Sequence, residues 1–135
     1  MANYEALARS NYFRVKDPEA FRQWCKDLGL EVITKKEEAL FGWMNTDGGI
    51  PSQRDNDQAE EEEDLDFFAE LATHLHPGEV AVAHEIGHEK MRCLDAVAVA
   101  INSEGVSVQL SLDEIYEQAQ ALRADPTTQI TTATY

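Results

Sequence analysis

The stretch EVAVAHEIGHEKMRCLDAVAVAINSEGVSVQLS, residues 79–111, decides the fold. Apolar residues alternate with small or polar residues in three runs, which start at Val80, Ala96 and Val106. A period of two is typical of a β-strand whose two faces lie in different surroundings. The polar segment Asn102–Gly105 predicts a hairpin loop between the last two runs. We therefore expect three consecutive antiparallel strands.

The first of these runs contains His84-Glu85-Ile86-Gly87-His88, which matches the pattern H-E-x-x-H. Over this short stretch the chain resembles the zincin metallopeptidases. In that family the pattern lies on a helix, where both histidines bind zinc and the glutamate activates water. The resemblance implies that His84 and His88 are zinc ligands and that Glu85 is the general base.

The residues around this pattern favour a strand instead of a helix. Val80 and Val82 are β-branched and fit a strand, and on a strand His84 and His88 lie about 13 Å apart. That separation is too large for one zinc ion with ligand bonds of about 2 Å. No histidine follows His88 to complete the set. We expect extended chain with no cofactor and no catalytic residue, and a zinc-dependent hydrolase is the alternative.

The N-terminal third predicts one helix among three strands. The aromatic and β-branched run at 11–16 indicates a strand. Asp17 before Pro18 is typical of a helix start, and Gly29 ends the helix. Two more strands are expected at 30–34 and 39–44.

Two further helices are expected downstream. Asp64 can cap the first of them, which Pro77-Gly78 closes. Ser111 and Glu114 form a capping box that opens the last helix. The inner face of this last helix is expected to carry Leu112, Ile115, Tyr116, Ala119 and Leu122.

This element order predicts an α+β fold: a mixed, mainly antiparallel sheet of about five to six strands packed with three helices. The order is strand, helix, two strands, loop, helix, three strands, helix. We expect a single domain over 1–123 that includes an acidic surface loop at 45–63, followed by a mobile polar tail at 124–135.

The charge is strongly one-sided, with 26 acidic residues against 11 basic ones and a net charge of −15. Such a surface repels nucleic-acid phosphates and anionic membranes, so we expect a basic protein surface as the partner, with no direct nucleic-acid binding. No apolar run reaches the roughly 20 residues that span a bilayer. The start, MANYEALARSNYF, does not have the pattern of a secretory signal, and we expect a cytoplasmic protein.

The acidic residues gather in DNDQAEEEEDLD, residues 55–66. This run is either a solvated loop leading into a helix, or a surface that docks a basic partner. A calcium loop is disfavoured because the sixth position is not glycine and the twelfth is not glutamate. The candidate partner-binding residues are Asp55, Asp57, Glu60, Glu61, Glu62, Glu63, Asp64 and Asp66.

The cysteines and the other histidines point to structural roles. Cys25 and Cys93 suggest no disulfide framework, and Cys25 shares a helical stripe with core residues. His74 and His76 lie at a helix end, where the helix dipole favours imidazolium.

From Asn3 to Leu122 the chain resembles a group of small acidic proteins of unknown function carried on phages, plasmids and integrated elements. The likeness is carried by SNYFRVKD (10–17), DGGIP (47–51), GEVAV (78–82), AVAVAIN (96–102) and SLDEIY (111–116). The resemblance implies an accessory role in a mobile element, such as an inhibitor that mimics nucleic acid.

Three hypotheses follow. The first is a non-enzymatic module that docks a basic partner through 55–66, and the second is the zinc hydrolase. The third is a structural or oligomeric protein that pairs through a strand edge. The oligomeric state is open.

Overall fold

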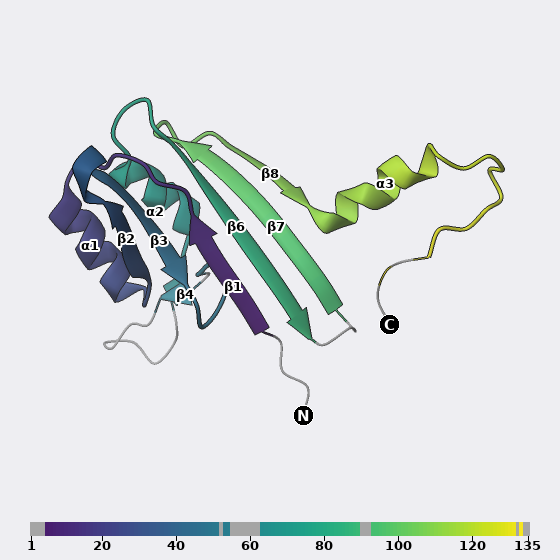
Figure 1. Ribbon diagram of the computed structural model, residues 1–135, viewed down its shortest axis with the longest axis horizontal. Helices are drawn as coiled ribbons and strands as arrows, with labels where there is room; N and C mark the ends of the chain where they lie inside the picture. Colours follow the sequence, from purple (N-terminus) through teal and green to yellow (C-terminus); the bar gives the residue numbers. More distant parts are fainter. Residues whose placement is uncertain (1–4, 52, 55–62, 90–92, 132, 134–135) are drawn as a thin grey trace.

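The computed structural model describes residues 5–51, 53–54, 63–89, 93–131 and 133. Six strands form one antiparallel sheet in the order β2-β3-β1-β6-β7-β8 (Figure 1). Their bounds are β1 Glu5–Ser10, β2 Glu31–Lys35, β3 Leu40–Asn45, β6 Val80–Glu89, β7 Cys93–Asn102 and β8 Ser107–Ser111. A separate pair joins β4 (Gln53–Arg54) to β5 (Glu63–Asp64).

The helices within the described residues are α1 (Pro18–Asp27), α2 (Phe67–His74) and α3 (Ile115–Gln120). Short 3₁₀ turns at Lys36–Glu38 and Leu112–Glu114 precede β3 and α3. An antiparallel sheet with helices segregated from it is an α+β fold, so the fold class expected from the sequence is confirmed.

The longest ladder joins β6 to β7, with register from Val80↔Asn102 to Glu89↔Cys93. The prediction that residues 80–89 are extended is therefore confirmed. The alternation divides β6 into two faces: Ala81 and Ala83 are buried, whereas Val80, His84 and Ile86 are exposed. Both alanines belong to the hydrophobic core, together with Phe21 and Leu71.

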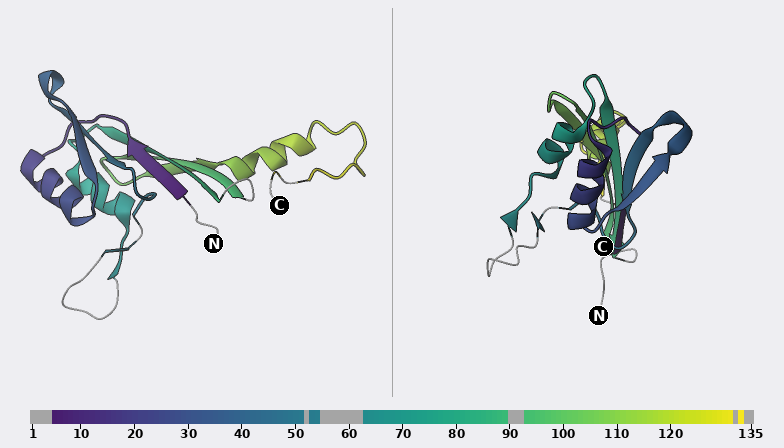
Figure 2. Two further views of the ribbon diagram at one scale, coloured as in Figure 1. Left: turned by 60° about the horizontal axis from the view of Figure 1, so that its bottom comes forward. Right: turned by 90° about the vertical axis from the view of Figure 1, so that its left-hand side faces the viewer.

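Both α1 and α2 lie on one side of the sheet (Figure 2). Phe21 from α1, Leu71 from α2 and Trp43 from β3 are fully buried between these layers. The helix start at Asp17 is confirmed, because its carboxylate accepts hydrogen bonds from Glu19 N and Ala20 N. Gly29 follows α1 at φ +74°, a conformation that favours glycine.

The second helix begins two residues later than expected. Its cap is Asp66, whose side chain accepts from Ala69 N at 3.2 Å, and the predicted cap Asp64 belongs to β5. A capping carboxylate must reach an amide of the first turn, and only Asp66 directly precedes the first helical residue, Phe67.

The predicted strand at 11–16 is wrong, because the strand is β1 and ends at Ser10. Residues 11–16 make only isolated bridges, Phe13↔Phe41 and Val15↔Leu75. The side chain of Asn11 bonds the backbone of β6, with its Oδ1 accepting from Val82 N at 2.8 Å. Phe13 and Val15 alternate like strand residues because both enter the core as the chain crosses toward α2.

The predicted inner face of the last helix is also wrong. Leu112, Ile115 and Leu122 are 49%, 57% and 85% exposed. The capping box of Ser111 and Glu114 is present, but α3 continues away from the sheet beyond β8 (Figure 1). We call residues 112–123 the arm. Strand β8 lies at the sheet edge, away from α1 and α2. The exposed apolar side chains of the arm therefore do not pack against these helices.

A close backbone approach at Gly42 joins β3 to the segment that follows β1. A Cβ atom on Gly42 would lie 2.5 Å from the carbonyl oxygen of Asn11 and 3.0 Å from Ser10 Oγ. The buried Ser10 hydroxyl accepts from Trp43 N at 2.9 Å. Only glycine leaves room for this crossing.

We predict that Gly42→Ala lowers the free energy of unfolding by about 1–3 kcal/mol, as expected when a methyl group is forced into a filled site. Urea unfolding followed by circular dichroism measures the loss. The control is Ser107→Thr, which adds a methyl group at an exposed strand position and should change stability by less than about 0.5 kcal/mol. Equal stability of Gly42→Ala and wild type would contradict the close approach.

Candidate functional site

Strand β6 positions the residues of the H-E-x-x-H pattern. Alternation places His84 and His88 on the exposed face and Glu85 on the opposite face. The histidines are four residues apart on extended chain, a separation of about 13 Å. The helical arrangement that the zincin pattern requires is therefore not formed. Within the described residues, no group of three or more His, Cys, Asp and Glu side chains lies close enough to hold a metal ion.

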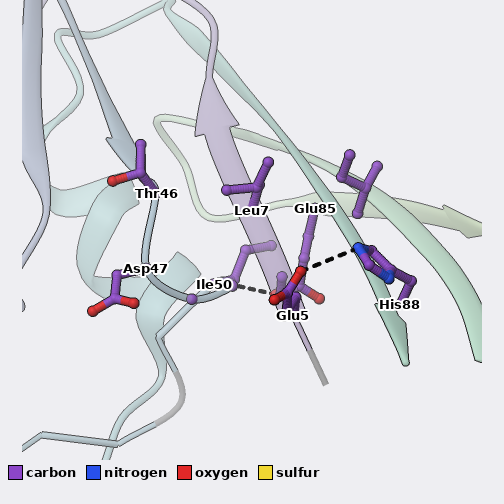
Figure 3. Close-up of a pocket in the computed structure, with 11 residues that line it drawn as sticks. Glu5, Leu7, Thr46, Asp47, Ile50, Glu85 and His88 are labelled. Atoms are coloured by element: carbon purple, nitrogen blue, oxygen red, sulfur yellow. Dashed lines mark hydrogen bonds and ion pairs between the residues drawn. The ribbon is translucent and has the colours of Figure 1, made fainter. Parts of the chain in front are cut away.

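A cavity of about 650 Å³ lies beside this part of β6 (Figure 3). It forms because β3 pairs with β1 only at Ala8 and Arg9, while β1 continues back to Glu5. The chain after β3 turns through Thr46–Ile50 and encloses the opening from the other side. Its lining residues are Glu5, Ala6, Leu7, Thr46, Asp47, Gly48, Gly49, Ile50, Glu85, Ile86 and His88.

Glu85 fastens the loop at Thr46–Ile50 to the sheet. Its Oε1 accepts a hydrogen bond from Ile50 N at 2.5 Å. Gly49 leaves room for this contact, because a Cβ atom there would collide with the Glu85 carboxylate and displace it. Asn45 also holds the loop, since its Nδ2 donates to Gly49 O at 2.9 Å. Glu85 thus has a structural role, and the catalytic role implied by the zincin pattern has no support in this geometry.

Among the described residues that line it, the cavity has more negative than positive charge. Glu5, Asp47 and Glu85 contribute carboxylates, and His88 is the only imidazole in the lining. His88 Nε2 lies 3.5 Å from Glu5 Oε2, with both side chains more than half exposed. An exposed pair of this kind contributes little to stability. The cavity is therefore suited to a cationic group rather than to an anionic one.

The acidic run lies mostly outside the described residues. Asp55, Asp57, Glu60, Glu61 and Glu62 belong to the part that is not described. Glu63 and Asp64 form β5 opposite β4, and Asp66 caps α2. The predicted partner-binding role of these residues stays a prediction.

His74 is an aromatic packing residue and not the charged helix cap that the sequence suggested. Its ring centre lies 5.0 Å from that of Trp24 and 6.0 Å from that of Phe21. Burial lowers the pKa of His74, and the carboxylates of Glu70 and Asp17 oppose that shift. Neutral imidazole is the form that suits this aromatic cluster.

The cysteine prediction is confirmed for Cys25, which is free and fully buried. Burial raises the pKa of its thiol to about 12, so it packs as an apolar core residue. The side chain of Cys93 lies outside the described part of the chain.

No family model matches the chain, and no curated protein or solved structure matches it either. Among the described residues, no helix combines the length and apolar character needed to cross a bilayer. The resemblance to acidic proteins of mobile elements stays a prediction, and so does the cytoplasmic location.

Sequence reasoning missed most of the cavity. Glu5, Asp47 and Ile50 come from separate parts of the chain, and no spacing rule connects them to Glu85. The pair Gly48-Gly49 was the one available signal, because paired glycines permit a close backbone approach.

We predict that Glu85→Ala lowers the free energy of unfolding by about 1–3 kcal/mol, because it leaves the Ile50 amide without its acceptor. Amide hydrogen exchange should show faster exchange at Ile50. The matched control is Glu85→Gln, which keeps an acceptor oxygen and should retain most of the protection. Slow exchange at Ile50 in the Glu85→Ala protein would contradict the assignment.

We predict that His74 lowers the stability of the folded chain at acidic pH. Its pKa is lower in the folded chain than the unfolded value of about 6.5, so the folded state binds fewer protons. The stability from neutral His74 is present above pH of about 6.5 and is lost as pH falls through the folded pKa. His74→Phe removes this cost, so its melting temperature should rise relative to wild type as pH falls. His76→Gln, at an exposed position, should show no such divergence.

Proposed function

We propose that the chain is a non-enzymatic acidic protein-binding module that docks a basic partner surface through residues 55–66. The observation that carries the proposal is the charge: 26 acidic against 11 basic residues, with eight of the carboxylates in DNDQAEEEEDLD. A surface of this sign attracts Lys- and Arg-rich surfaces and repels anionic ones.

Described residues just before 55–66 and at its end support the proposal because they are anchored to the body of the protein. Before the run, Glu85 holds Ile50 against β6. At its end, Asp66 caps α2, whose Phe67 and Leu71 are buried in the core. The β4–β5 pair brackets 55–62 and projects from the body beside the start of α2 (Figure 2).

The acidic cavity adds a second region of the same sign. It is lined by the loop from Thr46 to Ile50, which precedes β4 in the chain. Asp47 on that loop is exposed, as is Glu5 on β1. A basic partner on 55–66 would therefore meet further negative potential along the neighbouring surface.

Proteins that bind phosphate backbones present basic grooves, and a row of carboxylates can occupy such a groove. The nucleic-acid-mimicking inhibitor implied by the resemblance is one form of this proposal. The zinc-dependent hydrolase has no comparable support, because its two histidines lie far apart on β6.

We predict that replacing Glu60, Glu61, Glu62 and Glu63 with Gln slows association with an arginine-rich peptide by about tenfold at low salt, because local charge steers encounter. Stopped-flow fluorescence with a labelled peptide measures the rate. Raising the salt concentration should reduce the difference between variant and wild type, since the attraction is screened.

The matched control replaces Glu31, Glu37, Glu38 and Glu104 with Gln. All four are exposed and lie elsewhere on the chain, so this variant has the same net charge as the first. Slower association in the 60–63 variant alone supports a docking surface at 55–66. Equal rates in both variants would show an effect of total charge only, and an unchanged rate in the 60–63 variant would end the proposal.

A further inference from the structure

Strand β8 forms one edge of the sheet, and no strand of the described residues pairs with its outer side. Residues 106–110 are exposed, and the apolar ones among them, Val106, Val108 and Leu110, are 62%, 69% and 62% exposed. Soluble proteins usually protect an edge strand with charge, proline or a bulge. The opposite edge follows this rule, since β2 begins with exposed Glu31 and ends with exposed Lys35. The β8 edge has no charged residue and no proline.

Strand β8 itself carries no charge, and the acidic residues Asp113 and Glu114 come only after its end. From Ala96 to Leu112 the one charged residue is Glu104, which lies in the hairpin turn. The chain as a whole carries a net charge of −15. Two copies therefore repel each other in most orientations, and the β8 edge is where they can approach with little repulsion.

The hairpin turn shows which backbone groups of β8 face outward. Asn102 N donates to Val106 O at 3.0 Å, so these two residues form a hydrogen-bonded pair. Such pairs recur at every second residue of an antiparallel ladder. The backbone groups of Val108 and Leu110 are therefore turned toward β7, opposite Ala100 and Ala98.

The N–H and C=O groups of Ser107 and Gln109 then point away from β7, toward the open edge. The next outward amide, Ser111 N, is already bonded to Glu114 Oε2 in the capping box. The open edge thus offers a short row of donors and acceptors, centred on Val108, that bond no other part of the chain within the described residues.

We propose that the β8 edge binds the β8 edge of a second copy of this chain, extending the sheet through a two-fold axis at Val108. In this register Ser107 of each copy exchanges backbone hydrogen bonds with Gln109 of the other. On the exposed face Val108 meets Val108, and Val106 meets Leu110. The interface is isologous, as two-fold symmetry requires.

A second copy fits this edge better than the basic partner does. Recognition of a basic surface needs carboxylates, and β8 has none. A second β8 matches this edge because it is the same strand. It has outward backbone groups at the same spacing, apolar side chains on the same face, and no charge. This proposal stands on a different surface from residues 55–66 and does not depend on the proposed function.

Sedimentation equilibrium of the full chain over rising concentration tests the proposal. We expect a species of twice the 15.1 kDa chain mass. Its formation should strengthen with salt, because screening removes repulsion between two chains of charge −15. A single monomeric mass at every concentration and salt level would overturn the inference.

Gln109→Pro is the decisive variant. Proline removes an amide that points outward and spares the β7 ladder, which edge strands tolerate. Each copy loses one backbone hydrogen bond to its partner, so two are lost in the dimer. We therefore expect the dimer dissociation constant to rise by at least about 100-fold. The matched control is Gln109→Thr, which keeps the amide and should dimerise like wild type. Wild-type dimerisation of Gln109→Pro would overturn the proposal.

A cysteine variant tests the register without disturbing the backbone. Residues opposite each other in a pair that is not hydrogen-bonded have Cα atoms about 4.5 Å apart, close enough for a disulfide. In a Cys93→Ser background, Val108→Cys should form a cross-linked dimer on mild oxidation, and Val106→Cys should not. Efficient cross-linking at Val106 in place of Val108 would overturn the two-fold register.

The salt response separates this proposal from the proposed function. Docking of a basic partner on 55–66 should weaken with salt, whereas pairing through β8 should strengthen. The 60–63 variant should dimerise at least as well as wild type, because it carries less negative charge. Failure of either proposal therefore leaves the other intact.

Discussion

The pairing of β6 with β7 is the constraint on which the rest of the structure depends. This ladder runs over the full length of both strands, from Val80↔Asn102 to Glu89↔Cys93. It fixes the face of every side chain in between. One face presents Ala81 and Ala83 to the helical layer, and the other presents Val80, His84 and Ile86 to solvent. Shifting the register by one residue would exchange these two sets and bury the histidines.

The same ladder decides the chemistry of the H-E-x-x-H pattern. Extended chain separates His84 from His88 and places Glu85 on the other side of the sheet. Glu85 is then free to hold the loop after β3, through Ile50 N, and that bond shapes the acidic cavity. A pattern that is catalytic on a helix is structural on a strand, because backbone geometry decides which side chains can meet.

The sequence predicted the elements whose signal is local. Residues 80–111 showed a period of two, and Asp17 with Pro18 marked a helix start; both are present. The strand placed at 11–16 was wrong because Phe13 and Val15 alternate without pairing in a ladder. Glu5, Ile50 and Glu85 meet only in the folded chain, so no local pattern could have revealed the cavity.

The arm shows how an apolar pattern can indicate a surface that the single chain does not cover. The spacing of Leu112, Ile115 and Leu122 is that of a helix face packed on a core, yet these side chains are exposed. A six-residue helix such as α3 has little intrinsic stability. Its supports within the described residues are the Ser111–Glu114 capping box and the bond from Ala133 N to Tyr116 Oη. Exposed apolar residues therefore run from Val106, just before the edge strand β8, into the arm. In a chain with a net charge of −15, electrostatic repulsion between copies is weakest at residues 106–112, which carry no charge.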